Sequence, residues 1–400
     1  MKILFVLLLI ISQVALAQKN EGVTVAEVQK MINDSFASKW YEKIQLKGYA
    51  HFRYNRLGES NSKLNCPSCD KSMGDKQGFF LRRARLTFFG EINDKVYIYI
   101  QPDYATDANN QNYFQLRDAY FDYALSENKE WRVRSGISKV PFGFDNLQSS
   151  SNRGPLDRDD ALNTGTPNER DIGIFLMYAP TEVRKRFKEL TSNNLKGTGD
   201  YGMIAIGAYN GQSLNKKEEN NDLHRVVRFT YPFKLKNGQF IEASLQHYEG
   251  KYVVTKDASV TGTTDKLDSR QAASLIVYPQ PIGFQVEYNV GQGPEYDRVQ
   301  NKIATKNLKG GYAQINYQHY IGDHRFFPYV RYQEYKGGRK LENGAATDIR
   351  EWEFGTEWQP HGAFELTAAY AISDRIYQST ATNRSHQTGN LIRLQAQFNY

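Results

Sequence analysis

The stretch IQLKGYAHFRYN, residues 44–55, alternates apolar and polar side chains. A period of two places the apolar set on one face of a β-strand and the polar set on the other. The last ten residues, LIRLQAQFNY at 391–400, alternate in the same way. We therefore expect the folded part of the chain to begin and end with strands that have one apolar face and one polar face.

Fourteen further segments repeat this pattern, which makes sixteen candidate strands in all. They lie near residues 79–91, 95–104, 115–125, 130–140, 171–180, 201–210, 223–234, 240–250, 269–279, 283–291, 310–320, 326–336, 349–359 and 364–373. The connectors between them are short and long in turn, as they are when short turns face one compartment and long loops the other. The connector 181–200 breaks this rhythm, because it is long and charged where a short turn is expected. It is either an extended turn or a sign of a misplaced strand.

The composition excludes several classes of protein. Of 400 residues, 40 % are hydrophobic and 24 % charged, which excludes a wholly disordered chain. The longest uninterrupted apolar run, 3–11, is nine residues long, well short of the roughly 20 that a membrane-spanning helix needs. A barrel of strands is not excluded, because alternation hides its apolar surface. The 51 Lys and Arg against 44 Asp and Glu form no block suited to nucleic acid, so we expect no such partner.

The N-terminus has the features of an export signal. Lys2 precedes the apolar run, and Ala-Leu-Ala follows at 15–17 as a cleavage site. We expect a signal peptide at 1–17, a short periplasmic segment at 18–41 and a barrel at 42–400. Within the middle segment, apolar residues three or four apart indicate a short helix, although a frayed linker is an equal alternative at this length.

Strands that cross a membrane must close into a barrel, because backbone groups at an open edge find no water in hydrocarbon. The apolar faces then meet lipid, and a sixteen-stranded lumen is too wide for side chains to fill, so it holds water. Aromatic residues near strand ends, such as Tyr97, Tyr99, Trp352 and Trp358, suit the interfacial girdles. A soluble secreted β-sandwich or propeller is the alternative, but its connectors need not alternate in length.

Three segments carry a family resemblance. FFLRRARLTFFGEI at 79–92, QLRDAYFDYAL at 115–125 and WRVRSGISKVPFG at 131–143 resemble the phosphate-selective porin O and P family, with KVPFG as the most specific piece. The resemblance implies an all-β protein, a 16-stranded antiparallel transmembrane β-barrel with short periplasmic turns and long extracellular loops. It also implies a homotrimer in the outer membrane of a Gram-negative bacterium, with loop 141–170 folded inward as a constriction.

Alternation assigns several cationic side chains to the lumen. An arginine facing lipid at the membrane midplane costs roughly 2–4 kcal/mol, which argues that these residues point inward. Arginine and lysine side chains arranged in a ring around a pore favour anions, and arginine binds phosphate bidentately. The predicted pore-lining residues are Lys47, Arg53, Arg83, Arg85, Arg132 and Arg134 on strands and Arg153 and Arg158 in loop 141–170.

Acidic residues support an alternative, a lumen of balanced charge. Glu91, Asp118 and Asp122 also face inward and could pair with the arginines. Five glutamates do the same in the last strands: Glu287, Glu351, Glu353, Glu357 and Glu365. The lumen would then be basic on one side and acidic on the other, with only weak ion preference.

Cys66 and Cys69 lie in the first long loop. A redox pair and half of a metal site are conceivable, but a structural zinc site needs four ligands and the chain has no second pair. In an oxidising compartment we expect a disulfide that braces the loop.

Catalytic motifs were not found: the chain has no G-x-S-x-G, no H-E-x-x-H and no phosphate-binding glycine loop. We therefore expect no enzyme, no metal and no cofactor. The predicted function is a porin in outer-membrane lipid that passes small anionic or polar solutes by diffusion, with a preference for anions such as phosphate. An outer-membrane lipid hydrolase and a soluble secreted carbohydrate-active protein remain as alternatives.

Overall fold

The computed structural model describes residues 40–64, 78–106, 112–254, 265–380 and 383–400. The chain separates into two units, 1–44 and 45–400. In the first unit the described part forms a single 3-10 turn, η1 (Trp40–Lys43). The predicted signal peptide, the helix expected within 18–41, and Cys66 and Cys69 fall outside the described residues, so these predictions remain open.

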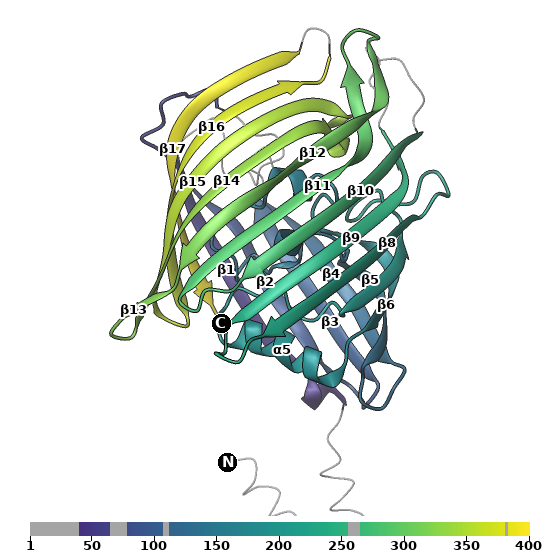
Figure 1. The fold of residues 1–400 in the computed structure, drawn as a ribbon, viewed down its shortest axis with the longest axis vertical. Coiled ribbons are helices and arrows are strands. Elements are labelled where there is room, and N and C mark those ends of the chain that lie inside the picture. Colours follow the sequence, from purple (N-terminus) through teal and green to yellow (C-terminus); the bar gives the residue numbers. More distant parts are fainter. Residues whose placement is uncertain (1–39, 65–77, 107–111, 255–264, 381–382) are drawn as a thin grey trace, which may run out of the picture. The chain divides into compact units, whose positions relative to one another are not determined.

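The second unit is a closed antiparallel barrel (Figure 1). Its strands are β1 (Gln45–Leu57), β2 (Gly78–Glu91), β3 (Val96–Thr106), β4 (Asn112–Ala124), β5 (Trp131–Lys139), β6 (Arg170–Tyr178), β7 (Ile204–Tyr209), β8 (His224–Lys234), β9 (Phe240–Val253), β10 (Asp265–Val277), β11 (Ile282–Asp297), β12 (Lys302–Tyr317), β13 (His319–Ile321), β14 (His324–Arg339), β15 (Ala345–His361), β16 (Phe364–Gln378) and β17 (Arg384–Asn399). Both β12 and the short β13 that follows it pair with β14, so these segments amount to sixteen barrel strands. The barrel closes where β1 pairs with β17 on one side and β2 on the other.

The faces of the barrel follow the alternation of the sequence. In β1, Leu46 is 61 % exposed on the outer wall, whereas Arg53 is 1 % exposed on the inner one. Large exposed apolar side chains recur on the outside of strands around the whole barrel. The apolar residues therefore face outward and the polar ones inward, which confirms the predicted barrel and excludes a sandwich with a dry core.

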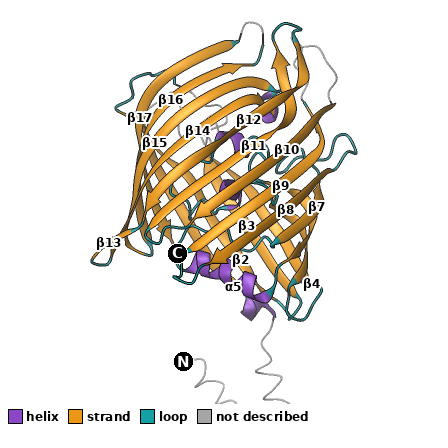
Figure 2. Ribbon diagram, in the orientation of Figure 1, coloured by secondary structure: helices purple, strands orange, loops and turns teal. Residues whose placement is uncertain are grey.

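At the long-loop end the strands of the second half run further than predicted. β11 and β12 leave only residues 298–301 between them, where the sequence pattern ends its strands at 291 and resumes at 310. The ladder continues because backbone pairing does not require an apolar outer face. Alternation marks only the part of a strand that lipid covers, and it therefore underestimates strands that project into water. Figure 2 draws β11 and β12 as long strands.

The irregular connector 181–200 is an extended turn, and no strand was misplaced. It contains the helix α5 (Thr181–Ser192), which lies at the short-turn end of the barrel (Figure 2). Val183, Phe187 and Leu190 recur at helical spacing and are buried in one cluster with Phe240 of β9 and Tyr278, which follows β10. Among the described residues, no helix is both long and apolar enough to cross a membrane.

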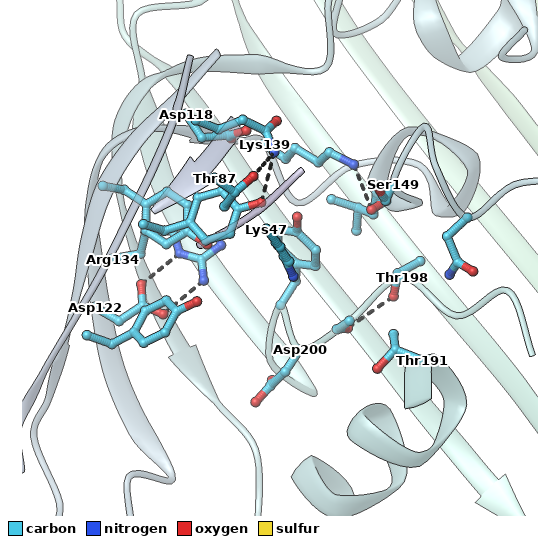
Figure 3. Close-up of a pocket in the computed structure, with 18 of the residues that line it drawn as sticks. Lys47, Thr87, Asp118, Asp122, Arg134, Lys139, Ser149, Thr191, Thr198 and Asp200 are labelled. Atoms are coloured by element: carbon cyan, nitrogen blue, oxygen red, sulfur yellow. Dashed lines mark hydrogen bonds and ion pairs between the residues drawn. The ribbon is translucent and has the colours of Figure 1, made fainter. Parts of the chain in front are cut away.

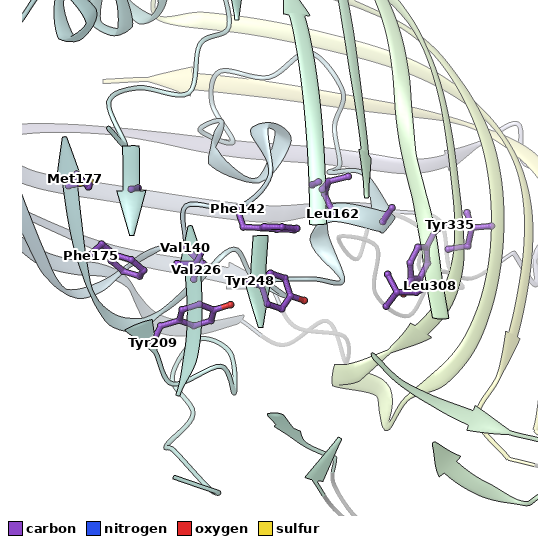
Figure 4. Packing of buried hydrophobic residues seen from close by; sticks show 14 residues of the cluster. Val140, Phe142, Leu162, Phe175, Met177, Tyr209, Val226, Tyr248, Leu308 and Tyr335 are labelled. Carbon is purple, nitrogen blue, oxygen red and sulfur yellow. The ribbon is translucent and has the colours of Figure 1, made fainter. Parts of the chain in front are cut away.

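Loop 141–170, hereafter the inner loop, lies inside the barrel. It contains two one-turn helices, α3 (Phe144–Leu147) and α4 (Asp160–Asn163). Phe142 packs edge-on against Tyr248 of β9, with ring centroids 4.8 Å apart, and Leu162 belongs to the same buried cluster as Tyr335 of β14 (Figure 4). Because these tyrosines point into the lumen, the contacts confirm the predicted inward fold.

Candidate functional site

Carboxylates of the inner loop bind arginines of the barrel wall. Asp160 accepts hydrogen bonds from Arg339 at 2.9 Å and from Arg375 at 3.0 Å. Asp157 pairs with Arg53 of β1 at 3.1 Å and also with Arg393 of β17. These partners are buried, so each pair ties the loop to a defined place on the wall formed by β14, β16, β17 and β1.

Four of the five inward glutamates of the last strands contact the inserted segments or the wall arginines that bind them. Glu287 accepts the backbone N–H of Phe144 at 2.7 Å, at the start of α3. Glu357 pairs with Lys196 of the extended turn at 2.7 Å. Glu351 and Glu353 bind the same wall arginines as the loop aspartates. The fifth, Glu365, accepts a hydrogen bond from Gln359 of β15 at 2.6 Å. The predicted inward orientation of all five is confirmed, and the first four help to hold the inserted segments in place.

The inner loop and the extended turn meet inside the barrel. The side chain of Gln148 donates to the backbone oxygen of Lys196 at 2.6 Å, and that of Asn152 donates to the oxygen of Gly197 at 3.0 Å. The two insertions come from opposite ends of the barrel. Together they cover the inner face of β8 to β17 and of β1 around Arg53, which we call the covered wall, whereas β2 to β6 and the first part of β1 form the open wall.

Two cavities lie along the open wall. One, of about 660 Å³, lies at the short-turn end and is lined by Lys47, Arg132 and Arg134 among others (Figure 3). The other, of about 220 Å³, is lined by strand residues and the loop. It includes the predicted Arg83, Arg85, Arg153 and Arg158. The structure thus brings seven of the eight predicted pore-lining residues to two neighbouring cavities.

Arg53 is the exception. Its guanidinium donates to Gln395 at 2.7 Å and to the backbone oxygen of Leu156 at 2.7 Å, beneath the inner loop. In the described part of the chain it lines neither cavity. Alternation shows which wall a residue faces but not what covers that wall, so the role of Arg53 in the pore stays a prediction.

Positive charge predominates in both cavities. Each is lined by eight cationic side chains and four carboxylates. Some are paired, as the alternative of a balanced lumen required: Arg134 binds Asp122 bidentately at 2.7 and 2.9 Å, and Arg85 binds Asp103 at 3.1 Å. The excess remains positive, and such a lining favours anions. Within the described residues, neither cavity includes any of the five glutamates of the covered wall.

Two β-bulges add arginines that alternation misses. In β2, His51 pairs with Arg83 and Phe52 with Leu81, so Arg82 is an extra residue. In β4, Gln101 pairs with Asp118 and Pro102 with Leu116, so Arg117 is extra in the same way. A bulge sets two successive side chains on one side of the sheet, and both extra arginines line the second cavity. The cost of an arginine facing lipid was the signal that could have revealed them.

The predicted aromatic girdle is correct for some residues and wrong for others. Trp352 is 47 % exposed on the outer wall and packs against Tyr332 with ring centroids 4.9 Å apart. Tyr97 and Tyr99 instead line the first cavity. They share the inward phase of Gln101 and Asp103 in β3, which nearness to a strand end cannot reveal.

A charged cluster lies where the two cavities adjoin. Lys139 and Arg170 line the first cavity, while Arg117, Arg158 and Glu169 line the second. Glu169 pairs with Arg117 at 2.9 Å, and with Arg158 and Arg170 at 2.7 Å each. We call these five residues the junction cluster. No group of three His, Cys, Asp or Glu side chains in the described residues could hold a metal ion.

A closed barrel with an apolar exterior, a charged lumen and an inserted loop defines a porin-type membrane channel. The model of the family described as phosphate-selective porin O and P matches residues 62–400, and the chain belongs to this family. It is thus a channel of the outer membrane of a Gram-negative bacterium, and the soluble alternative is wrong.

Solved structures show the same fold at low sequence identity. The outer membrane channel DcaP of Acinetobacter baumannii is 14% identical, with a TM-score of 0.54 over 89% of this chain and 97% of that one. OmpF of Salmonella typhi, in complex with daunomycin, is 14% identical, with a TM-score of 0.58 over 91% and 99%. OmpT of Vibrio cholerae, in a trimer form, is 10% identical, with a TM-score of 0.51 over 89% and 99%. A search of curated proteins finds no match.

Proposed function

We propose that this channel passes small hydrophilic solutes by passive diffusion along the open wall and prefers anions, phosphate among them. The observation that carries the proposal is the charge of the two cavities, with twice as many cationic side chains as carboxylates. The acidic residues of the covered wall do not offset this excess, since they are engaged with the inserted segments. The family name supports the same preference.

The junction cluster is suited to weak, reversible binding of a passing anion rather than to tight binding. An anion that loses hydration water at the junction cluster meets guanidinium groups such as Arg117 and Arg158, which replace water as donors. These groups already share carboxylate partners, for example Glu169. Shared donors bind a passing anion more weakly than unshared ones. Conduction needs this balance, because the site must bind an anion strongly enough for it to enter and weakly enough for it to leave.

The predicted residues take distinct roles in this proposal. Lys47, Arg132 and Arg134 attract anions into the cavity at the periplasmic, short-turn end. Arg83, Arg85, Arg153 and Arg158 do the same on the far side of the junction cluster, and the bulge arginines add to them. We further propose that the chain is a homotrimer in outer-membrane lipid, needs no cofactor and has no catalytic activity. The trimer form described for OmpT supports the first of these points.

Reversal potentials in planar bilayers test the proposal. The purified channel is placed between two KCl solutions of different concentration, and phosphate is then added as a competitor of the chloride current. We expect a reversal potential of the sign that chloride selectivity gives, and a chloride current that falls as phosphate rises. A reversal potential of the opposite sign would contradict the anion preference, and hydrolysis of lipid by the purified protein would favour the enzyme alternative.

A further inference from the structure

The carboxylate of Glu169 pairs with three arginines at once. Its carboxylate receives Arg158 on one oxygen at 2.7 Å, and Arg117 and Arg170 on the other at 2.9 and 2.7 Å. The side chain is 6 % exposed. Burial opposes ionisation, yet Arg158, Arg117 and Arg170 outweigh it and hold the pKa of Glu169 well below its usual value. The group is therefore an anion held among guanidinium groups where the two cavities adjoin.

The backbone at this point is also unusual. Asn168 and Glu169 both have a φ of 63°, in the left-handed region. Asparagine adopts this region readily, but glutamate seldom does. A residue persists in such a conformation only where surrounding contacts hold it. The backbone N–H of Glu169 donates to the oxygen of Thr166 at 2.7 Å, its own oxygen accepts the N–H of Val140 at 3.0 Å, and the arginines hold its carboxylate.

Glu169 differs from the other carboxylates of the open wall in its place in the chain. Asp103, Asp118 and Asp122 project from β3 and β4, whose ladders fix their positions. Glu169 is the last residue of the inner loop before β6 begins at Arg170. Its side chain can therefore leave the arginines through local torsions without breaking a strand pairing.

We infer that the Glu169 carboxylate occupies the position a permeating oxyanion takes between Arg117, Arg158 and Arg170, and so acts as a tethered competitor that sets the affinity of the channel for such anions. A carboxylate and a phosphate present the same kind of acceptor oxygens to a guanidinium fork. A phosphate at this place must displace the tethered group, and the group returns as the phosphate leaves. The inference rests on the proposed function, since it requires anions to pass the junction cluster.

The experiment compares Glu169→Gln with Asp122→Asn. Both variants remove one negative charge from the open wall, but the partner of Asp122 is Arg134 in the first cavity, which is not a member of the junction cluster. Chloride current through single channels is measured while inorganic phosphate is raised. We expect the half-blocking phosphate concentration to fall about tenfold in E169Q. In D122N we expect a fall of less than about threefold, because the arginine that this variant frees, Arg134, is not part of the junction cluster.

An equal fall in both variants would show that only net charge matters, and would overturn the inference. A rise in E169Q would overturn it too, because it would mean that Glu169 serves only to order the arginines. If E169Q does not insert, E169D replaces it: its shorter side chain should lower the half-blocking concentration, and an unchanged or higher value would overturn the inference.

The wild-type reversal potential separates the two failures. A cation-selective wild type contradicts the proposed function, whatever the variants do. An anion-selective wild type with no difference between E169Q and D122N leaves the proposed function standing and removes the tethered competitor. If the wild type is not anion-selective, the inference still requires a larger shift of reversal potential toward anions in E169Q than in D122N, and an equal shift would overturn it.

Discussion

The open wall and the covered wall carry the same alternating pattern and use it differently. On the open wall, Arg83 and Arg85 of β2 line a cavity. On the covered wall, Arg339 and Arg375 hold Asp160 of the inner loop, and glutamates hold α3 and the extended turn. Most charges of the open wall line the cavities, whereas most charges of the covered wall attach the segments that narrow the lumen; Arg339 does both.

A charged side chain on the inner face of a barrel does not always line the pore, because an inserted segment can cover it. Arg53 and Arg85 both follow the inward phase of neighbouring strands and both are buried. Arg85 lines the second cavity, whereas Arg53 lies under the inner loop. Selectivity should therefore follow the open wall, and the position of the loop should follow the covered wall.

The largest effect is expected where the inner loop is attached. Asp160→Asn leaves Arg339 and Arg375 buried without their shared carboxylate, and removing one partner of a buried pair costs about 3–5 kcal/mol. The loop should move off the covered wall, so single-channel conductance should rise while urea stability falls. Asp222→Asn is the control, because its pair with Lys251 is exposed and contributes about 0–1 kcal/mol. Equal stability of the two variants would mean that ion pairs do not hold the loop.

The extended turn provides the next test. Phe187 of α5 is 1 % exposed in the cluster that includes Phe240 and Tyr278, and truncation of a buried phenylalanine costs about 3 kcal/mol or more. Phe187→Ala should lower the temperature at which the folded barrel loses its gel mobility, with reversal potential unchanged. Lys188→Ala, on the exposed side of the same helix, should leave that temperature where it is. A change of selectivity in F187A would contradict the division between the two walls.

The sequence was sufficient for the barrel because period two is imposed by lipid on one side and water on the other. The helix in the connector 181–200 could also have been predicted, since Val183, Phe187 and Leu190 have helical spacing. The sequence could not place the strand ends beyond β11, where water wets both faces and the constraint that produces alternation is absent.

Three features of the site depend on contacts between different segments of the chain. The bulges at Arg82 and Arg117 arise from pairing with β1 and β3, and the cost of an arginine that faces lipid is the one sequence signal for them. The position of Arg53 depends on where residues 156 and 157 of the inner loop come to rest. Glu169 was missed for the same reason, because its three arginines come from three different segments.

Selectivity should respond to the open wall alone. Arg83→Gln with Arg85→Gln removes two charges from the second cavity, and a unit charge at about 4 Å contributes about 1 kcal/mol in water. The anion-to-cation permeability ratio should fall roughly tenfold at low ionic strength and less in high salt. Arg53→Gln is the matched control: it should lower stability and leave the ratio nearly unchanged. A ratio that falls as far in R53Q would place Arg53 in the pathway and break the comparison.

The smallest effect is expected at the periplasmic mouth. Lys47 lines the first cavity with its ammonium 4.6 Å from the centre of the Phe89 ring, and its side chain remains exposed to the water of that cavity. Screening there is strong, so Lys47→Gln should change the permeability ratio by no more than about twofold, and only at low salt. Lys236→Gln, in the short turn between β8 and β9, should change it less still. Equal effects of the two variants would mean that charge at this end acts through the general surface field, whereas an effect as large as that of R83Q/R85Q would move the selective region from the second cavity to the mouth.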